Sequence, residues 1–161
     1  MLLHLGPGCF DPGRQLVVGH GVAAKVAQHK LSVFGLEQID GQQVVALFGG
    51  QTLPEHWHPP VGDDPGKEET VRVVSGTLRF YILGDDNMCE GAIPAGKENV
   101  YTARHELIFK PGDQITMEPG TKHWFQAGED GVVMYSFSSV ARDVLDGFTD
   151  PEIKRTTEIQ D

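Results

Sequence analysis

Gly50-Gln-Thr-Leu-Pro-Glu-His56-Trp-His58-Pro-Pro-Val-Gly-Asp-Asp-Pro-Gly-Lys-Glu-Glu69-Thr-Val-Arg-Val-Val-Ser-Gly76 is the stretch that decides the fold. One residue separates His56 from His58, so both imidazoles face the same side of a β-strand, where side chains alternate with a period of two. The Pro, Gly and Asp residues of 59–66 predict a loop, which can bring the carboxylate of Glu69 back to that side. Two imidazoles and a carboxylate are ligands that suit a divalent first-row metal.

A fourth ligand lies downstream, at His123 in Pro119-Gly-Thr-Lys-His123-Trp-Phe125. A His-x-His pair alone is common on solvated strand faces and predicts no metal by itself. The pattern as a whole is more specific, because glycines bracket the first three residues and Pro119-Gly precedes the fourth. We therefore expect a metal site formed by His56, His58, Glu69 and His123.

The spacing around these four residues has a family counterpart. Five residues separate Gly50 from His56, six separate Glu69 from Gly76, and Gly112-Asp precedes the segment that carries His123. This arrangement resembles the two sequence motifs of the cupin superfamily. The resemblance implies an all-β fold, the cupin double-stranded β-helix or jelly-roll barrel.

Short apolar segments separated by Gly, Pro and Asp independently favour a β-sandwich or barrel. We expect strands at 15–18, 30–39, 42–48, 105–110, 115–118, 121–126 and 132–138, and a hairpin of 69–74 and 77–83 that turns at Ser75-Gly76. A marginal helix is expected within 140–145. The whole chain, 1–161, is expected to form a single cupin domain, with an irregular N-terminal arm (1–14), the barrel (15–139) and a C-terminal segment (140–161).

Composition limits the class of partner. The 161 residues are enough for one domain. Lys and Arg number 13 against 23 Asp and Glu, a net charge of −10, which argues against nucleic acid or an anionic membrane as partner. Neither a signal peptide nor an apolar run of about 18 residues is evident, and Cys9 and Cys89 have no metal-binding spacing. We expect a cytoplasmic protein with reduced thiols.

A closer resemblance is to the small D-lyxose ketol-isomerases of the cupin superfamily. The segments that carry it are Pro54-Glu-His-Trp-His-Pro-Pro-Val61, Gly66-Lys-Glu-Glu-Thr70, Tyr101-Thr102, His105-Glu106, Thr121-Lys-His-Trp-Phe-Gln-Ala-Gly128 and Phe148-Thr-Asp-Pro151. The resemblance implies a Mn²⁺-type divalent ion, with Fe²⁺, Co²⁺, Ni²⁺ and Zn²⁺ left open. It also implies aldose–ketose interconversion of a free sugar such as D-lyxose or D-mannose, and a homodimer.

Aldose–ketose isomerisation moves one proton between adjacent carbons through an enediolate, so it needs acid–base groups besides the metal. Lys67, two residues before Glu69, is the candidate catalytic group. Phe125 shares strand parity with His123 and is expected to face the cavity, and Trp124 to face a packing layer. Arg79 and Tyr81 are candidate substrate-binding residues. Glu55 is expected to point away from the metal, in a salt bridge or in solvent.

Three positions depart from the isomerase pattern. Ser136 stands where the family carries a glutamate suited to proton abstraction, Ala127 replaces the Asn that ends the second cupin motif, and Glu152 replaces the Arg of an Asp-Pro-Arg ending. Metal binding survives these changes, whereas isomerase activity is put in question. Two alternatives therefore stay open: a non-catalytic sugar-binding cupin and an Fe²⁺-dependent cupin oxygenase.

Overall fold

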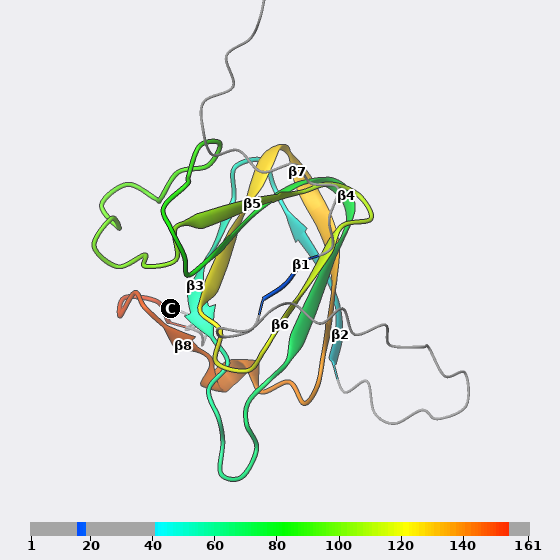
Figure 1. Cartoon of the computed structure of the whole chain (residues 1–161), viewed down its shortest axis with the longest axis vertical. Coiled ribbons are helices and arrows are strands. Elements are labelled where there is room, and N and C mark those ends of the chain that lie inside the picture. Colours follow the sequence, from blue (N-terminus) through cyan, green and yellow to red (C-terminus); the bar gives the residue numbers. More distant parts are fainter. Residues whose placement is uncertain (1–15, 19–40, 155–161) are drawn as a thin grey trace, which may run out of the picture.

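The computed structural model describes residues 16–18 and 41–154. Its elements in chain order are β1 (Leu16–Val18), β2 (Gly41–Leu47), β3 (Thr52–Trp57), β4 (Glu69–Ile82), β5 (His105–Phe109), β6 (Gln114–Met117), β7 (His123–Ser138), the 3-10 helix η1 (Asp143–Leu145) and β8 (Gly147–Phe148). The strands follow one another around a central axis (Figure 1). In this part of the chain, no helix is long and apolar enough to cross a membrane.

Two long strands form the frame of the barrel. β4 and β7 run antiparallel along their whole length, and each pairs with different neighbours at its two ends. The first half of β4 pairs with β6 and its second half with β5, while β7 pairs with β3 near its start and with β2 near its end. The remaining connections place β1 beside β6 and β8 beside β3. Apart from the parallel pairing of β1 with β6, the strands pair antiparallel, and this barrel is the expected double-stranded β-helix.

The expected hairpin at Ser75-Gly76 is wrong, because the chain continues there in one bent strand. Register shifts interrupt the pairing of β4 with β7 between Val73 and Leu78, which is how β-bulges bend a strand. Gly76 has a φ of +82°, and a Cβ at this position would lie 2.1 Å from the carbonyl oxygen of Gly131 on β7. Glycine therefore allows the backbones of these two paired strands to approach closely here, and it does not mark a chain reversal.

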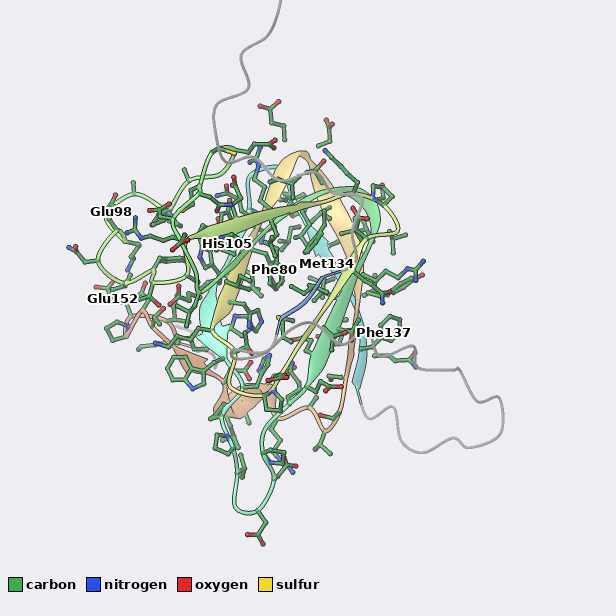
Figure 2. The ribbon with its side chains drawn as sticks, viewed as in Figure 1. Phe80, Glu98, His105, Met134, Phe137 and Glu152 are labelled. Atoms are coloured by element: carbon green, nitrogen blue, oxygen red, sulfur yellow. The ribbon has the colours of Figure 1, made fainter. Side chains whose placement is uncertain are left out.

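The bulges also change which residues face the barrel interior. Before them the odd-numbered residues of β4, such as Val71 and Val73, are buried in the core, and after them the even-numbered Leu78, Phe80 and Ile82 are. β7 changes phase in the same way, from Phe125 and Ala127 to Val132 and Met134. Figure 2 shows Phe80 and Met134 inside the barrel, with Phe137 on its outside.

A second apolar cluster packs against the outer face of the barrel, under the long connection between β5 and β4. Its buried members are Tyr81, Tyr101, Ala103 and Trp124, against which Met88, Ile93 and Val100 pack. The indole nitrogen of Trp124 donates to the carbonyl oxygen of Ala103 at 2.7 Å. The packing role expected for Trp124 is therefore confirmed.

The C-terminal segment covers one end of the barrel. β8 pairs with β3 through His56 and Phe148, and η1 lies at the same end as the loop that joins β3 to β4 (Figure 1). The marginal helix expected in 140–145 is this short 3-10 turn. The strand expected at 30–39, the arm 1–14 and Cys9 lie outside the described residues, so their predictions and the proposed domain limits stay predictions.

Candidate metal centre

The four predicted ligands converge from three strands that are distant in sequence. β3 carries His56 and is followed at once by His58, Glu69 begins β4, and His123 begins β7. Antiparallel pairing sets His123 opposite both His56 and Ile82. One ligand atom from each of the four residues lies within 4.8 Å of the others, and all four residues are buried. The barrel register thus brings together what the sequence pattern predicted.

Hydrogen bonds define the protonation of His56 and His123. The Nδ1 atom of His56 lies 2.8 Å from the carbonyl oxygen of Pro54, and that of His123 lies 2.8 Å from the carbonyl oxygen of Thr121. A carbonyl oxygen only accepts, so each Nδ1 carries the proton and each Nε2 keeps a lone pair. Burial lowers the pKa of His56 to about 3 and that of His123 to about 4. Both imidazoles are therefore neutral near pH 7.

The Nε2 atom of His123 is buried and has no hydrogen-bond partner among the described residues. A buried polar atom without a partner costs about 1–3 kcal/mol. A lone pair directed toward two further imidazoles and a carboxylate is satisfied by a cation. This orphaned nitrogen is the observation that fits a metal ion best.

His58 joins two carboxylates. Its Nδ1 lies 2.7 Å from Oδ1 of Asp146 and its Nε2 lies 2.8 Å from Oε2 of Glu69. Burial opposes the charge of His58, but the hydrogen bonds with Asp146 and Glu69 outweigh burial and raise its pKa. A bound ion would replace the Nε2 proton, while Nδ1–H continued to donate to Asp146, an arrangement common around metal-ligating histidines.

Glu69 is held ionised despite its burial. Burial favours its neutral form, but the hydrogen bond from His58 and the nearby Lys67 ammonium hold the pKa well below the usual range. The hydroxyl of Ser136 donates to Oε1 of Glu69, and the Lys67 Nζ lies 3.4 Å from Oε2. Three neutral or readily deprotonated imidazoles with one carboxylate form a donor set that fits a divalent first-row ion.

The cluster lies at one wall of a cavity of about 190 Å³, roughly the liquid volume of six water molecules at about 30 Å³ each. Its apolar wall comes from the core strands: Val45, Leu53, Val71, Phe125 and Met134. Its polar wall comprises the ligands His56, His58 and Glu69 together with Gln43, Lys67, Ser136, Asp143 and Asp146. A small polar molecule in this partly apolar cavity can therefore reach His56, His58 and Glu69.

Of the other predicted site residues, Lys67 and Phe125 line this cavity, but Arg79 and Tyr81 do not. Tyr81 stacks on Trp124 with ring centroids 3.7 Å apart, and its hydroxyl donates to Glu106 at 2.8 Å. Arg79 lies with its Nε 4.0 Å from a carboxylate oxygen of Glu90. The phase change at the bulges of β4 explains this correction, because it turns residues 79 and 81 to the outer face.

Glu55 also corrects an expectation. It points away from the ligands, as the strand parity of β3 predicts, but it is neither exposed nor paired with a cation. Its carboxylate accepts hydrogen bonds from the backbone N–H and hydroxyl of Thr102 and from the N–H of Ala103, each at 2.7 Å. Glu55 therefore ties the strand of His56 to the long outer connection.

Two acidic residues of the site were missed by sequence reasoning. Asp143 and Asp146 belong to the C-terminal segment, more than 70 residues after Lys67 and His58, which they contact. No strand periodicity marks them. The signal available was the Asp-x-x-Asp spacing itself, which sets both carboxylates on one side of a helical turn.

Comparison with known proteins identifies the family. Residues 42–161 match the model of the D-lyxose isomerase family. The chain is 49% identical over 117 residues to the D-lyxose ketol-isomerase of Cohnella laeviribosi, covering 72% of this chain and 64% of that protein. It is 49% identical over 120 residues to the D-lyxose/D-mannose isomerase of Thermosediminibacter oceani, covering 73% and 65%. The chain thus spans less than two thirds of the length of these two relatives.

A relative from Thermofilum sp., a D-lyxose ketol-isomerase, is 41% identical over 137 residues, covering 80% of this chain and 76% of the relative. Among solved structures, the L-ribose isomerase of Cellulomonas parahominis with L-ribose aligns with a TM-score of 0.55 at 20% identity, covering 68% of this chain and 58% of that one. That of Acinetobacter sp. DL28 aligns with a TM-score of 0.52 at 18% identity, covering 68% and 59%. These structures support the fold, and the sequence matches show that the chain belongs to the D-lyxose isomerase family.

Proposed function

We propose that this chain is a metal-dependent aldose–ketose isomerase of free sugars, with D-lyxose and D-mannose as its first candidate substrates. The observation that carries the proposal is the convergence of His56, His58, Glu69 and His123 beside a cavity of about 190 Å³. Family membership supports the same reaction class. A site built for aldoses needs both a place for a cation and room beside it for a small polyol.

The ligand residues would hold the ion through the Nε2 atoms of the three histidines and a carboxylate oxygen of Glu69. When bound, a divalent ion supplies Lewis-acid stabilisation of the negative charge that develops on the sugar oxygens. Mn²⁺ is our first choice because the resemblance to the D-lyxose ketol-isomerases implies it, and Fe²⁺, Co²⁺, Ni²⁺ and Zn²⁺ remain candidates because they also suit a mixed imidazole and carboxylate donor set.

Lys67 is the candidate catalytic group next to the reacting oxygens. Its Nζ lies 3.4 Å from Oε2 of Glu69 and its side chain is about nine-tenths buried. An ammonium in a site shielded from water stabilises negative charge on an oxygen more strongly than it would in bulk water. Phe125 offers a flat apolar surface for the C–H face of a sugar, and Ser136 steadies Glu69 from the other side.

One observation favours a second function. Ser136 occupies the position of the expected glutamate and its hydroxyl already donates to Glu69, so sugar binding without turnover is the main alternative. An Fe²⁺-dependent oxygenase is the other alternative, because a three-histidine, one-carboxylate set also suits iron.

The test is a panel of aldoses with protein loaded separately with Mn²⁺ and Fe²⁺. The isomerase predicts formation of the ketose and exchange of the C2 proton with D₂O. Saturable binding without exchange would identify a binding protein, and oxygen consumption that occurs with Fe²⁺ but not with Mn²⁺ would identify an oxygenase. A null result across the common aldoses would overturn the isomerase proposal.

Two further proposals accompany this function. We expect a homodimer, to be measured by light scattering on the purified chain, and a cytoplasmic location, to be measured by cell fractionation. The net charge of −10 supports a protein that takes a small neutral sugar and not a polyanionic partner.

A further inference from the structure

The proposed reaction requires a group that removes the C2 proton of the aldose, and Ser136 is poorly suited to do so. A serine hydroxyl is not a base near pH 7, and this one is engaged as a donor to Oε1 of Glu69. Ser136 is 5% exposed and belongs to the last long strand, β7. No carboxylate of β7 lines the described cavity. The base of the proposed reaction therefore comes from another element.

Three carboxylates line the cavity: Glu69, Asp143 and Asp146. Glu69 is a proposed metal ligand that also accepts from His58 and Ser136. Asp146 accepts from Nδ1 of His58 at 2.7 Å, so it orients a ligand. Asp143, in contrast, is held by Lys67 and Gln43, two side chains that line the same cavity.

The environment of Asp143 fits a group that meets the substrate. Its Oδ1 lies 3.2 Å from Nζ of Lys67 and its Oδ2 lies 3.0 Å from Nε2 of Gln43. The Lys67 ammonium therefore stands between Asp143 and Glu69, with contacts of 3.2 and 3.4 Å. The Asp143 side chain keeps 23% of its surface exposed, so it borders the cavity without being sealed from it.

We propose that Asp143, supplied by η1, is the catalytic base of this chain and takes over the proton transfer for which Ser136 lacks a carboxylate. The inference rests on the isomerase function proposed above. A carboxylate oxygen of Asp143 would remove the proton from C2 of the aldose. The C2–H electron pair then forms the C1=C2 bond while the C1=O π pair moves onto O1.

The second half of the reaction balances without any added reactant. Asp143 returns the same proton to C1, where a C–H bond forms. The hydroxyl proton of O2 passes to O1, and C2 becomes the carbonyl carbon of the ketose. Lys67 remains an ammonium throughout, holding Asp143 by its Oδ1 and facing the negative oxygens. Gln43 limits rotation of the carboxylate by donating to its Oδ2.

The decisive variant is Asp143→Asn, which keeps the size of the side chain but removes the base. Loss of a general base lowers rates by about 10²–10⁴-fold, so we expect C2-proton exchange to fall by that factor. Metal content and the dissociation constant for the sugar should stay near the wild-type values. Asp63→Asn is the matched control, because Asp63 is exposed in the loop between β3 and β4 and should exchange at the wild-type rate.

Chemical rescue separates a base from a structural residue. Asp143→Ala leaves room for a small carboxylate, so added formate should restore exchange in proportion to its concentration, whereas the bulkier Asn variant should not respond. Wild-type exchange rates in Asp143→Asn, or loss of metal in that variant, or absence of any formate response in Asp143→Ala, would overturn the assignment while leaving the isomerase function intact. A wild-type protein that exchanges no aldose would remove the isomerase function first, and the assignment with it.

Discussion

Two buried glutamates on neighbouring strands show how differently one fold can use a carboxylate. Glu69 on β4 is 8% exposed and Glu106 on β5 is 3% exposed. Glu106 accepts hydrogen bonds from the backbone N–H groups of residues 89, 90 and 91 and from the hydroxyl of Tyr81, at 2.7–3.0 Å. Among the described residues, the carboxylate of Glu69 is contacted by side chains alone, namely His58, Lys67 and Ser136, with Nε2 of His123 at 3.9 Å.

The difference lies in what the partners can do. Backbone N–H groups cannot lose their protons or move far, so they fix Glu106 as an anchor for the loop that follows β4. An imidazole can exchange a proton for a metal ion, and Nε2 of His123 has no hydrogen-bond partner among the described residues. Burial of a charge thus does not identify a functional site, but the chemistry of its partners does.

The strongest test of this contrast is Glu69→Gln. Removing the anionic ligand should strip the metal and lower isomerase activity by at least about 10³-fold, since loss of one electrostatic stabiliser alone costs about 10²–10³-fold. His123→Ala should do the same. Metal content measured by elemental analysis, together with the aldose assay, checks both variants.

The matched control for Glu69→Gln is Glu106→Gln, the same change at the structural carboxylate. It should bind metal as the wild type does. If Glu106→Gln lost its metal while Glu69→Gln kept it, the division between functional and structural glutamates would be reversed.

A finer test concerns Asp146, which belongs to the functional side of the contrast because it contacts the proposed ligand His58. Asp146→Asn keeps the size of the side chain but weakens the hold on Nδ1 of His58. Partners of ligating histidines typically contribute about 10–100-fold to metal affinity or activity, so we expect a loss of that size. Competition with a metal-sensitive dye measures it, and an unchanged affinity would show that the hydrogen bond between Asp146 and His58 does not support metal binding.

Sequence reasoning succeeded where the chemistry repeats at a fixed spacing. Strand parity predicts that His56 and His58 face the same side, and the Pro- and Gly-containing loop after them predicts that the chain returns so that Glu69 can meet them. The same alternation correctly predicted that Phe125 faces the cavity and that Trp124 packs in the outer cluster. Their agreement with the structure follows from the period-two geometry of strands.

Sequence reasoning failed where that period is broken. The bulges of β4 between Val73 and Leu78 change which alternate residues face the interior, so Arg79 and Tyr81 face outward. Gly76, whose sequence context predicts a turn, instead lies where β4 closely approaches β7. Asp143 and Asp146 were missed for another reason. Their contacts with Lys67 and His58 depend on how the C-terminal segment folds back over the barrel, which no local pattern encodes.

For the structural carboxylate, Glu106→Gln should lower the free energy of unfolding by about 2 kcal/mol. The hydrogen bonds to Glu106 lose their charged acceptor, and one of the N–H or O–H donors then faces the amide NH₂ group, which cannot accept. That loss in free energy corresponds to a melting temperature lower by about 4–8 °C. Burial favours the neutral acid, but the backbone N–H groups of Glu90 and Cys89 outweigh it and lower the pKa of Glu106.

A carboxyl with a lowered pKa stabilises the fold above its unfolded pKa of about 4.3 and loses that contribution as the pH falls through its folded value. The difference in melting temperature between the wild type and Glu106→Gln should therefore be at its full size near pH 7 and shrink below about pH 4. Calorimetric scans across this range measure it. A gap that stayed constant down to pH 3 would contradict the assigned role.

The smallest effect is expected at Glu152, the residue that replaces the arginine of the isomerase pattern. Its side chain is 79% exposed and pairs with Lys97, which also contacts Asp150 at 2.7 Å. Figure 2 shows Glu152 at the periphery of the molecule. Exposed ion pairs contribute little, and Lys97 keeps Asp150 when Glu152 is removed. Glu152→Ala should therefore leave activity and melting temperature unchanged. That result would mean that replacing the family's arginine by Glu152 changes only the protein surface. A loss of turnover in Glu152→Ala would instead mean that the C-terminal segment affects the site through residues other than Asp143 and Asp146.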